Sequence, residues 1–183
     1  LHRQILYDDD DVRSGLTKIE AARRNLHRSA PSVMIDAVHT KITEDNIDAL
    51  VDSVDIVIDA VDNTITRYVV NDSALSKGIP YVFGGVVETA GNVMTIIPGL
   101  TPCLRCLWPH PEEVADHQKA SEAGVLSSIA TLVASIQVTE AIKLIVGDWE
   151  NVIPGLLTID IWRNHYQVVP VKQDPLCACV DSV

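Results

Sequence analysis

Four cysteines fall in two tight pairs that could hold a metal ion. The sequence places Cys103 near Cys106, and Cys177 near Cys179. Thiolates are preferred zinc ligands, and two pairs from distant segments can form a tetrahedral four-thiolate site. Buried free thiols and a redox pair are the alternatives, although Pro109 argues against the helix that a redox cysteine needs after Cys103. The C-x-C spacing of the second pair is tighter than the usual C-x-x-C.

A second group of polar side chains follows DIVIDAV, residues 55–61. This β-branched apolar run predicts a buried strand, and Asp59, Asp62 and Asn63 lie where that strand should end. Ligand sites of open α/β sheets lie at the carboxyl ends of strands, so carboxylates there can hold magnesium and its nucleotide. The alternative is that Asp62 only caps the next helix through its side-chain oxygen.

Cations near the start of the sequence could contact phosphate groups. Arg3 is one, and Lys18 opens a predicted helix whose N-terminal dipole already favours anions. The alternative for both is a solvated surface charge. We expect the acidic run at 8–11 to be a solvated loop without a catalytic role.

The elements that must position these residues alternate between helix and strand. Helices are expected over 15–28, from Thr43, over 64–77 and over 124–146. Strands are expected over 32–40, 55–61, 79–88, after a turn at Gly91-Asn92, and over 154–161 and 165–171. The pattern predicts an α/β fold, a Rossmann-like doubly wound sheet with an antiparallel C-terminal extension. The helix over 124–146 is apolar nearly all round, which predicts burial in the domain or in a dimer interface.

Composition restricts the class of protein. With 183 residues, 47% of them hydrophobic, the chain can bury a substantial core, so we expect one globular domain. A net charge of -11 and few aromatic residues argue against nucleic-acid binding. No apolar run reaches the roughly 18 to 20 residues of a membrane span, and no signal peptide is evident. We therefore expect a cytoplasmic protein without membrane contact, where paired cysteines favour a metal over disulfides.

Together these residues resemble the ThiF/MoeB/HesA family, relatives of ubiquitin-activating enzymes that adenylate the C-terminal glycine of a small ubiquitin-like sulfur carrier. The shared motifs are LHRQ at 1–4, GLTK at 15–18, DNTITR at 62–67, PCLRCLWP at 102–109 and DPLCAC at 174–179. The resemblance covers nearly the whole chain and implies a single adenylation domain over residues 1–183 that is incomplete at its N-terminus.

The resemblance also implies roles for individual residues. Arg3 and Lys18 would contact the phosphates of ATP with Gln4 beside them, and Asp62 would hold Mg²⁺. Asn63 and Arg67 follow in the same motif, where Arg67 would either assist at the nucleotide or brace the helix. The catalytic set would be Asp62, Arg3 and Lys18. The four cysteines would bind a structural zinc ion away from the nucleotide.

The implied reaction is attack of a carrier carboxylate on the α-phosphorus of ATP, with release of pyrophosphate. Positive groups would stabilise the developing negative charge. The carrier would belong to molybdopterin or thiamine synthesis, and its tail would enter under the loop near 112–121 of a homodimeric enzyme. The alternatives are adenylation of another peptide carboxylate, and a non-catalytic, zinc-stabilised module that binds a carrier.

Two departures from the family pattern affect the expected chemistry. The Gly-rich G-x-G-x-x-G turn that cradles phosphates in the family is not in this sequence, so we expect the chain by itself to bind ATP poorly. Ala120 stands where many relatives have a cysteine that can join a carrier covalently. We therefore expect the reaction to stop at the acyl-adenylate.

Overall fold

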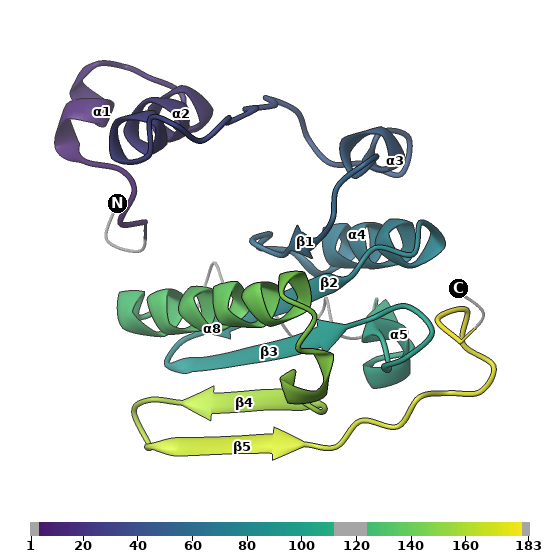
Figure 1. The fold of residues 1–183 in the computed structure, drawn as a ribbon. Helices are drawn as coiled ribbons and strands as arrows, with labels where there is room; N and C mark the ends of the chain where they lie inside the picture. Colours follow the sequence, from purple (N-terminus) through teal and green to yellow (C-terminus); the bar gives the residue numbers. More distant parts are fainter. Residues whose placement is uncertain (1–3, 112–123, 181–183) are drawn as a thin grey trace. The chain divides into compact units, whose positions relative to one another are not determined.

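The computed structural model describes residues 4–111 and 124–180, and it divides into two compact units (Figure 1). The first unit covers Leu1–Lys41 and the second covers Ile42–Val183. Each unit is described by itself below.

Two capped helices form the first unit. Helix α1 covers Asp9–Arg13 and helix α2 covers Lys18–Ser29. Each begins with a capping box, in which the side chains of the N-cap and the third helical residue bind each other's backbone N–H. The loop expected at 8–11 is therefore wrong, because Asp8 caps α1 and the carboxylate of Asp11 is buried against Arg24 and Asn25.

The strand expected over 32–40 is not formed, and these residues have no regular structure. Several of their apolar side chains are exposed, Met34 at 95%, while Ile35 and Ala37 are partly buried. A strand needs a partner for its backbone groups, and none of the strands described pairs with this segment.

The second unit is built on a mixed five-stranded sheet. Its strands are β1 (Val57–Ile58), β2 (Tyr81–Val87), β3 (Ala90–Ile96), β4 (Leu156–Asp160) and β5 (His165–Val169). They lie in the order β1-β2-β3-β4-β5, with β1 and β2 parallel and every later pair antiparallel. The predicted α/β fold with an antiparallel C-terminal extension is confirmed. Among the described strands, parallel pairing is limited to β1 with β2.

Helices cover both faces of this sheet (Figure 1). They are α3 (Ile47–Leu50), α4 (Thr64–Ser76), α5 (Leu104–Leu107) and α8 (Ser127–Ile145), with a short 3-10 helix at Trp149–Asn151. Alternate residues of β2 point to opposite faces, so Phe83 packs with Tyr68 of α4 while Val82 packs with Val133 of α8. The central strands β2 and β3 are thus mostly buried, whereas β5 is largely exposed.

The turn between β2 and β3 differs from the prediction. In the antiparallel pairing of β2 with β3, Val87 lies opposite Ala90, so the turn consists of Glu88 and Thr89. Gly91 lies inside β3, where an added Cβ would come 2.5 Å from the Val133 side chain of α8. The glycine that suggested a turn is therefore required for close packing of a helix on the sheet.

Helix α8 is long and apolar enough to cross a membrane by length and composition alone. Its Ile129 and Val133 are buried against the sheet, which accounts for part of that composition. Its outer face carries Val138, Ile142 and Ile145, which are 50%, 53% and 68% exposed.

Candidate functional site

Asp62 and Asn63 lie in the turn between β1 and α4, at the carboxyl end of β1. Asn63 is the N-cap of α4, and its Oδ1 accepts a hydrogen bond from the backbone N–H of Thr66 at 2.9 Å. Asp62 is exposed, and within the described residues its carboxylate accepts only a long 3.5 Å contact from the Asn63 side chain. The capping alternative for Asp62 is therefore wrong, because Asn63 caps the helix. The carboxylate of Asp62 has the oxygen chemistry that Mg²⁺ prefers.

Arg67, one turn into α4, is tied to the strand ends beside Asp62. Its Nε donates to Oδ2 of Asp59 at 3.0 Å, and its Nη2 donates to the carbonyls of Val61 at 2.8 Å and Gly84 at 3.1 Å. The guanidinium also lies 5.2 Å from the ring centre of Phe83, and the side chain is 13% exposed. These contacts are those of a largely buried structural arginine.

The partner carboxylate of Asp59 is almost completely buried. It accepts further hydrogen bonds from the hydroxyl of Tyr81 and from the backbone N–H of Val61, both at 2.8 Å. Burial raises the pKa of Asp59 above its ordinary value, although the guanidinium of Arg67 acts in the opposite direction. Burial, together with the charge of Asp59, raises the pKa of Tyr81 so that its hydroxyl stays a donor.

Gln137 of α8 reaches the same strand end from the other face of the sheet. Its Nε2 donates to the carbonyls of Asp59 at 2.8 Å and Val82 at 3.0 Å. Gly84 leaves room for it, since an added Cβ would lie 2.4 Å from the Gln137 side chain. Sequence reasoning missed Tyr81 and Gln137. The available signal was a glutamine inside an otherwise apolar helix, which requires buried hydrogen-bond partners.

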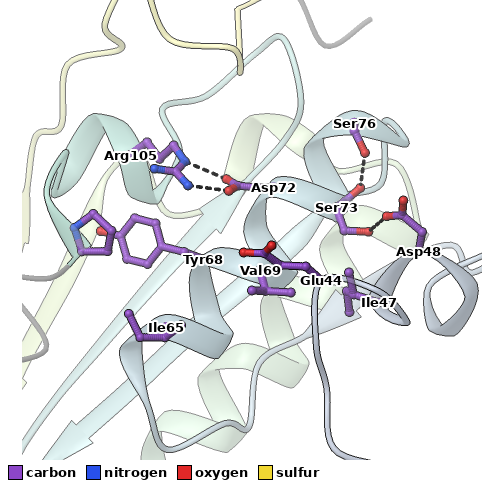
Figure 2. A pocket seen from close by; sticks show the side chains of 11 residues that line it. Glu44, Ile47, Asp48, Ile65, Tyr68, Val69, Asp72, Ser73, Ser76 and Arg105 are labelled. Atoms are coloured by element: carbon purple, nitrogen blue, oxygen red, sulfur yellow. Dashed lines mark hydrogen bonds and ion pairs between the residues drawn. The ribbon is translucent and has the colours of Figure 1, made fainter.

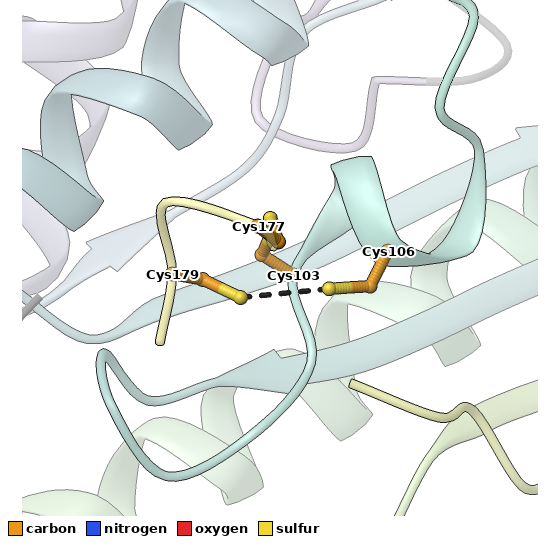
Figure 3. Close-up of side chains that lie close together, drawn as sticks. All are labelled: Cys103, Cys106, Cys177 and Cys179. Atoms are coloured by element: carbon orange, nitrogen blue, oxygen red, sulfur yellow. Dashed lines mark hydrogen bonds between the residues drawn. The ribbon is translucent and has the colours of Figure 1, made fainter. Parts of the chain in front are cut away.

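The four cysteines gather at one place in the second unit (Figure 3). Their Sγ atoms all lie within 4.8 Å of one another, and the Cys103–Cys177 and Cys106–Cys179 contacts are each 3.5 Å. A tetrahedral site with Zn–S bonds of about 2.3 Å has sulfurs about 3.8 Å apart. The arrangement therefore fits a four-thiolate zinc site, and the C-x-C pair is accommodated in it.

The sequence argued against a helix after Cys103, but the structure has a short one there. Helix α5 begins directly after Cys103 and ends at Leu107, before Pro109 can interrupt it. Burial raises the pKa of Cys103, the opposite of what a redox nucleophile needs. Burial also raises the pKa of Cys179, to about 11. For Cys106 burial acts in the same direction but is outweighed by hydrogen bonds led by that from the backbone N–H of Asp174, so its pKa is lowered.

The remaining predicted site residues belong to the first unit. Gln4 is exposed, and Lys18 is the exposed first residue of α2. Gln4 and Lys18 belong to the first unit, whereas Asp62 and its neighbours belong to the second. Arg3, Ala120 and the expected carrier loop at 112–121 lie outside the described residues.

A surface groove of about 470 Å³ lies between α3, α4 and α5 (Figure 2). On its wall the guanidinium of Arg105 binds the carboxylate of Asp72 and lies 5.2 Å from the ring centre of Tyr68. None of the site residues predicted from the sequence lines this groove.

Comparisons with known proteins agree with the fold and the motifs. The sequence model of the ThiF family matches residues 1–179. The chain is 37% identical to the sulfur carrier protein ThiS adenylyltransferase of Bacillus subtilis, over 98% of this chain and 53% of that protein. It is 34% identical to the SAMP-activating enzyme E1 of Haloferax volcanii, over 97% of this chain and 64% of that protein.

The fold also resembles a solved structure. The crystal structure of E. coli MccB with ATP superposes with a TM-score of 0.79 at 19% identity, covering 97% of this chain and 54% of MccB. At this identity the likeness establishes the fold alone. The chain spans between about half and two thirds of the length of these relatives.

Proposed function

The chain belongs to the ThiF family, and from this membership we propose that it is the greater part of an adenylyltransferase domain that activates a ubiquitin-like sulfur carrier. The carboxylate of the carrier's C-terminal glycine displaces pyrophosphate from ATP, so the product is an acyl-adenylate and no protein nucleophile is required. The observation that carries the proposal is Asp62, an exposed carboxylate at the carboxyl end of β1 that the helix cap does not use.

In this proposal Asp62 holds Mg²⁺ and Asn63 fixes the adjoining turn. When bound, the ion supplies positive charge to the phosphates as negative charge develops. Arg3, Gln4 and Lys18 bind the ATP phosphates, and Lys18 does so at a helix N-terminus that favours anions. The four cysteines hold a structural zinc ion, for which their geometry is suited.

The partners are a carrier of the molybdopterin or thiamine type and a second copy of the chain. Support for the carrier comes from the name of the Bacillus subtilis relative. Support for a homodimer comes from the exposed apolar side chains on the outer face of α8. We assign the enzyme to the cytoplasm, without a nucleic-acid or membrane partner.

Pyrophosphate exchange tests the proposal, measured on the chain extended at its N-terminus by the Gly-rich segment that the family places there. Exchange should depend on the carrier and should fall steeply, to a small but measurable residual rate, in Asp62→Ala. The matched control is Asp55→Ala, which removes an exposed aspartate before β1, at the opposite end of that strand. Absence of carrier-dependent exchange, or full exchange in Asp62→Ala, would contradict the proposal.

Two outcomes would favour the alternatives. Exchange that depends on an unrelated peptide, and not on a carrier, would indicate adenylation of another carboxylate. Carrier binding without any heat from ATP and Mg²⁺ in isothermal titration would indicate a non-catalytic, zinc-stabilised binding module.

A further inference from the structure

We propose that Arg67 is a positioning residue, which fixes the backbone of residues 59–63 so that the Asp62 carboxylate is held ready for its ligand. The inference rests on the function proposed above for Asp62. It concerns a residue that the family motif places beside the nucleotide but whose contacts in this structure are with the protein itself.

The guanidinium of Arg67 is already committed to protein acceptors. Two of its nitrogens make three hydrogen bonds, to Asp59, Val61 and Gly84, and its Cζ lies 5.2 Å from the ring centre of Phe83. The planar fork of arginine can serve acceptors in several directions at once, whereas lysine offers a single point charge. Arg67 thereby joins the end of β1, the turn after it and the neighbouring strand β2.

Hydrogen bonds fix the backbone N–H and carbonyl groups of the residues before Asp62. The Asp59 N–H donates to the carbonyl of Val82 at 3.0 Å, and the Asp59 carbonyl accepts from Gln137. The Val61 N–H binds the Asp59 carboxylate, and the Val61 carbonyl binds Arg67. On the other side of Asp62, the side chain of Asn63 caps α4.

Asp62 is therefore an exposed residue between two anchored neighbours. A ligand group held in this way loses little conformational freedom on binding, which is the basis of preorganisation. Without Arg67, the Val61 carbonyl would lose the hydrogen bond from the guanidinium, and the buried Asp59 carboxylate would lose its counter-ion. The turn that carries Asp62 would then be free to move.

The energetics of the pair support a positioning role over a purely stabilising one. The side chains of Arg67 and Asp59 are 13% and 1% exposed, so both charges have lost most of their hydration. A buried ion pair often contributes no more to stability than a well-packed apolar pair would. The advantage of the buried Arg67–Asp59 pair is therefore a fixed geometry at the turn.

Arg67→Lys tests the proposal, because it keeps the charge but replaces the two separate donor nitrogens of Arg67 with one. In pyrophosphate exchange at limiting Mg²⁺ we expect a loss of roughly 10- to 100-fold, the range found when groups supporting a metal ligand are removed. The Mg²⁺ concentration for half-maximal rate should rise. The KM for ATP at saturating Mg²⁺ should change far less.

A double-variant cycle separates positioning from direct contact with the nucleotide. If Arg67 acts through Asp62, adding Arg67→Lys to Asp62→Ala should lower the residual rate by less than about twofold. Additive losses, together with a raised KM for ATP at saturating Mg²⁺, would overturn the proposal and make Arg67 a nucleotide ligand. Unchanged Mg²⁺ dependence in Arg67→Lys would also overturn it.

Arg105→Lys is the matched control. Arg105 likewise binds an aspartate, Asp72, and lies 5.2 Å over an aromatic ring, but it lines the groove of Figure 2 and not the Asp62 turn. The Arg105→Lys variant should show the same Mg²⁺ dependence of pyrophosphate exchange as the unsubstituted protein. Should Arg67→Lys fail to fold, Asp59→Asn, which keeps the side-chain shape without the charge, should shift the Mg²⁺ dependence in the same direction.

Amide hydrogen exchange gives a readout that does not require activity. Peptides covering residues 59–63 should exchange faster in Arg67→Lys than in the unsubstituted chain, and not in Arg105→Lys. Faster exchange in a protein without any pyrophosphate exchange would contradict the proposed function but leave the anchoring by Arg67 intact. Unchanged amide exchange in Arg67→Lys would remove the inference whatever the activity.

Discussion

At the scale of single residues, neighbouring side chains take separate tasks. Asn63 satisfies the first turn of α4, and this leaves the Asp62 carboxylate exposed beside it. Had Asp62 been the cap, its oxygen would be engaged by a backbone N–H. An acid followed by an amide therefore suits a turn that starts a helix and, in the function proposed above, also holds a metal ion.

Removal of one cysteine should release the proposed zinc. Cys179→Ser replaces a completely buried ligand, so we expect bound zinc to fall from about one ion per chain to near zero and the melting temperature to fall. Metal analysis and thermal unfolding measure these changes. A chelator should lower the melting temperature of the unsubstituted chain and have little effect on the variant; equal zinc contents in both proteins would refute the site.

Gly84→Ala should destabilise the protein because its Cβ would overlap the side chain of Gln137. We expect a loss of roughly 1–3 kcal/mol in the free energy of unfolding, the range for overpacking a closed interior. Urea unfolding provides the measurement. At Gly85 the nearest atom to an added Cβ is a ring carbon of Phe83 at 3.1 Å, so Gly85→Ala is the milder control. Equal costs would argue against the packing explanation.

Sequence reasoning found the residues whose chemistry depends on local spacing. The cysteine pairs are visible because their close spacing is typical of metal ligands, and Asp62 was predicted because it follows a β-branched apolar run; its role at the nucleotide stays a prediction. The partners of Asp59 could not be found in this way. Tyr81 and Gln137 reach it from a neighbouring strand and from α8, and only the packed sheet determines which polar groups meet there.

At the scale of elements, helices were predicted better than turns and strand ends. The apolar periods of α4 and α8 are long enough to define them. Strand β1 was expected over 55–61 but covers only Val57 and Ile58, although the Asp59 N–H still donates to the Val82 carbonyl of β2. Gly91 was assigned to a turn because the packing of α8 on β3 cannot be seen in a local pattern.

The turn between β4 and β5 should make stability sensitive to acid. The carboxylate of Asp160 accepts hydrogen bonds from the backbone N–H groups of Trp162 and Arg163, from the Thr89 hydroxyl and from the Arg163 guanidinium. The backbone N–H of Arg163 is the largest cause that lowers the pKa of Asp160 below 3.8. This contribution to stability is therefore complete above the ordinary pKa and is lost as the pH falls through the lower folded-state pKa.

Asp160→Asn should lessen this acid sensitivity. Urea midpoints measured at neutral pH and near the lowered pKa should differ less in the variant than in the unsubstituted chain. Asp55→Asn changes an exposed aspartate before β1 and should keep the original pH dependence. Identical pH profiles for the Asp160 variant and the unsubstituted chain would contradict the proposed role of the carboxylate.

At the scale of the whole molecule, α8 serves two surfaces. One side of the helix closes the core of the second unit, and Val138, Ile142 and Ile145 lie on the exposed side. Their spacing of four and three residues forms one stripe along the helix. The nearly uniform apolar sequence is thus explained on one side by the sheet, and on the other by the homodimer proposed above.

Ile142→Glu should weaken that homodimer. A carboxylate placed in the middle of an apolar interface loses hydration without a partner, so we expect the dimer Kd to rise by about 10-fold or more. Sedimentation velocity over a range of concentrations measures the change. Trp162→Glu, which alters a side chain that is 76% exposed in the turn after β4, is the control. A monomeric unsubstituted chain, or a dimer unaffected by Ile142→Glu, would exclude α8 as the interface.

The order of the sheet has a kinetic consequence. Each strand pairs with the strand that precedes it in the chain, and the β2–β3 and β4–β5 pairs are hairpins with short connections. Among the described strands, the β1–β2 pairing bridges residues 59–80 and the β3–β4 pairing bridges the longer segment 97–155, whose closure costs roughly 2 kcal/mol more chain entropy than a hairpin turn. The two hairpins can form early and independently, and their joining across α8 is the step expected to set the refolding rate.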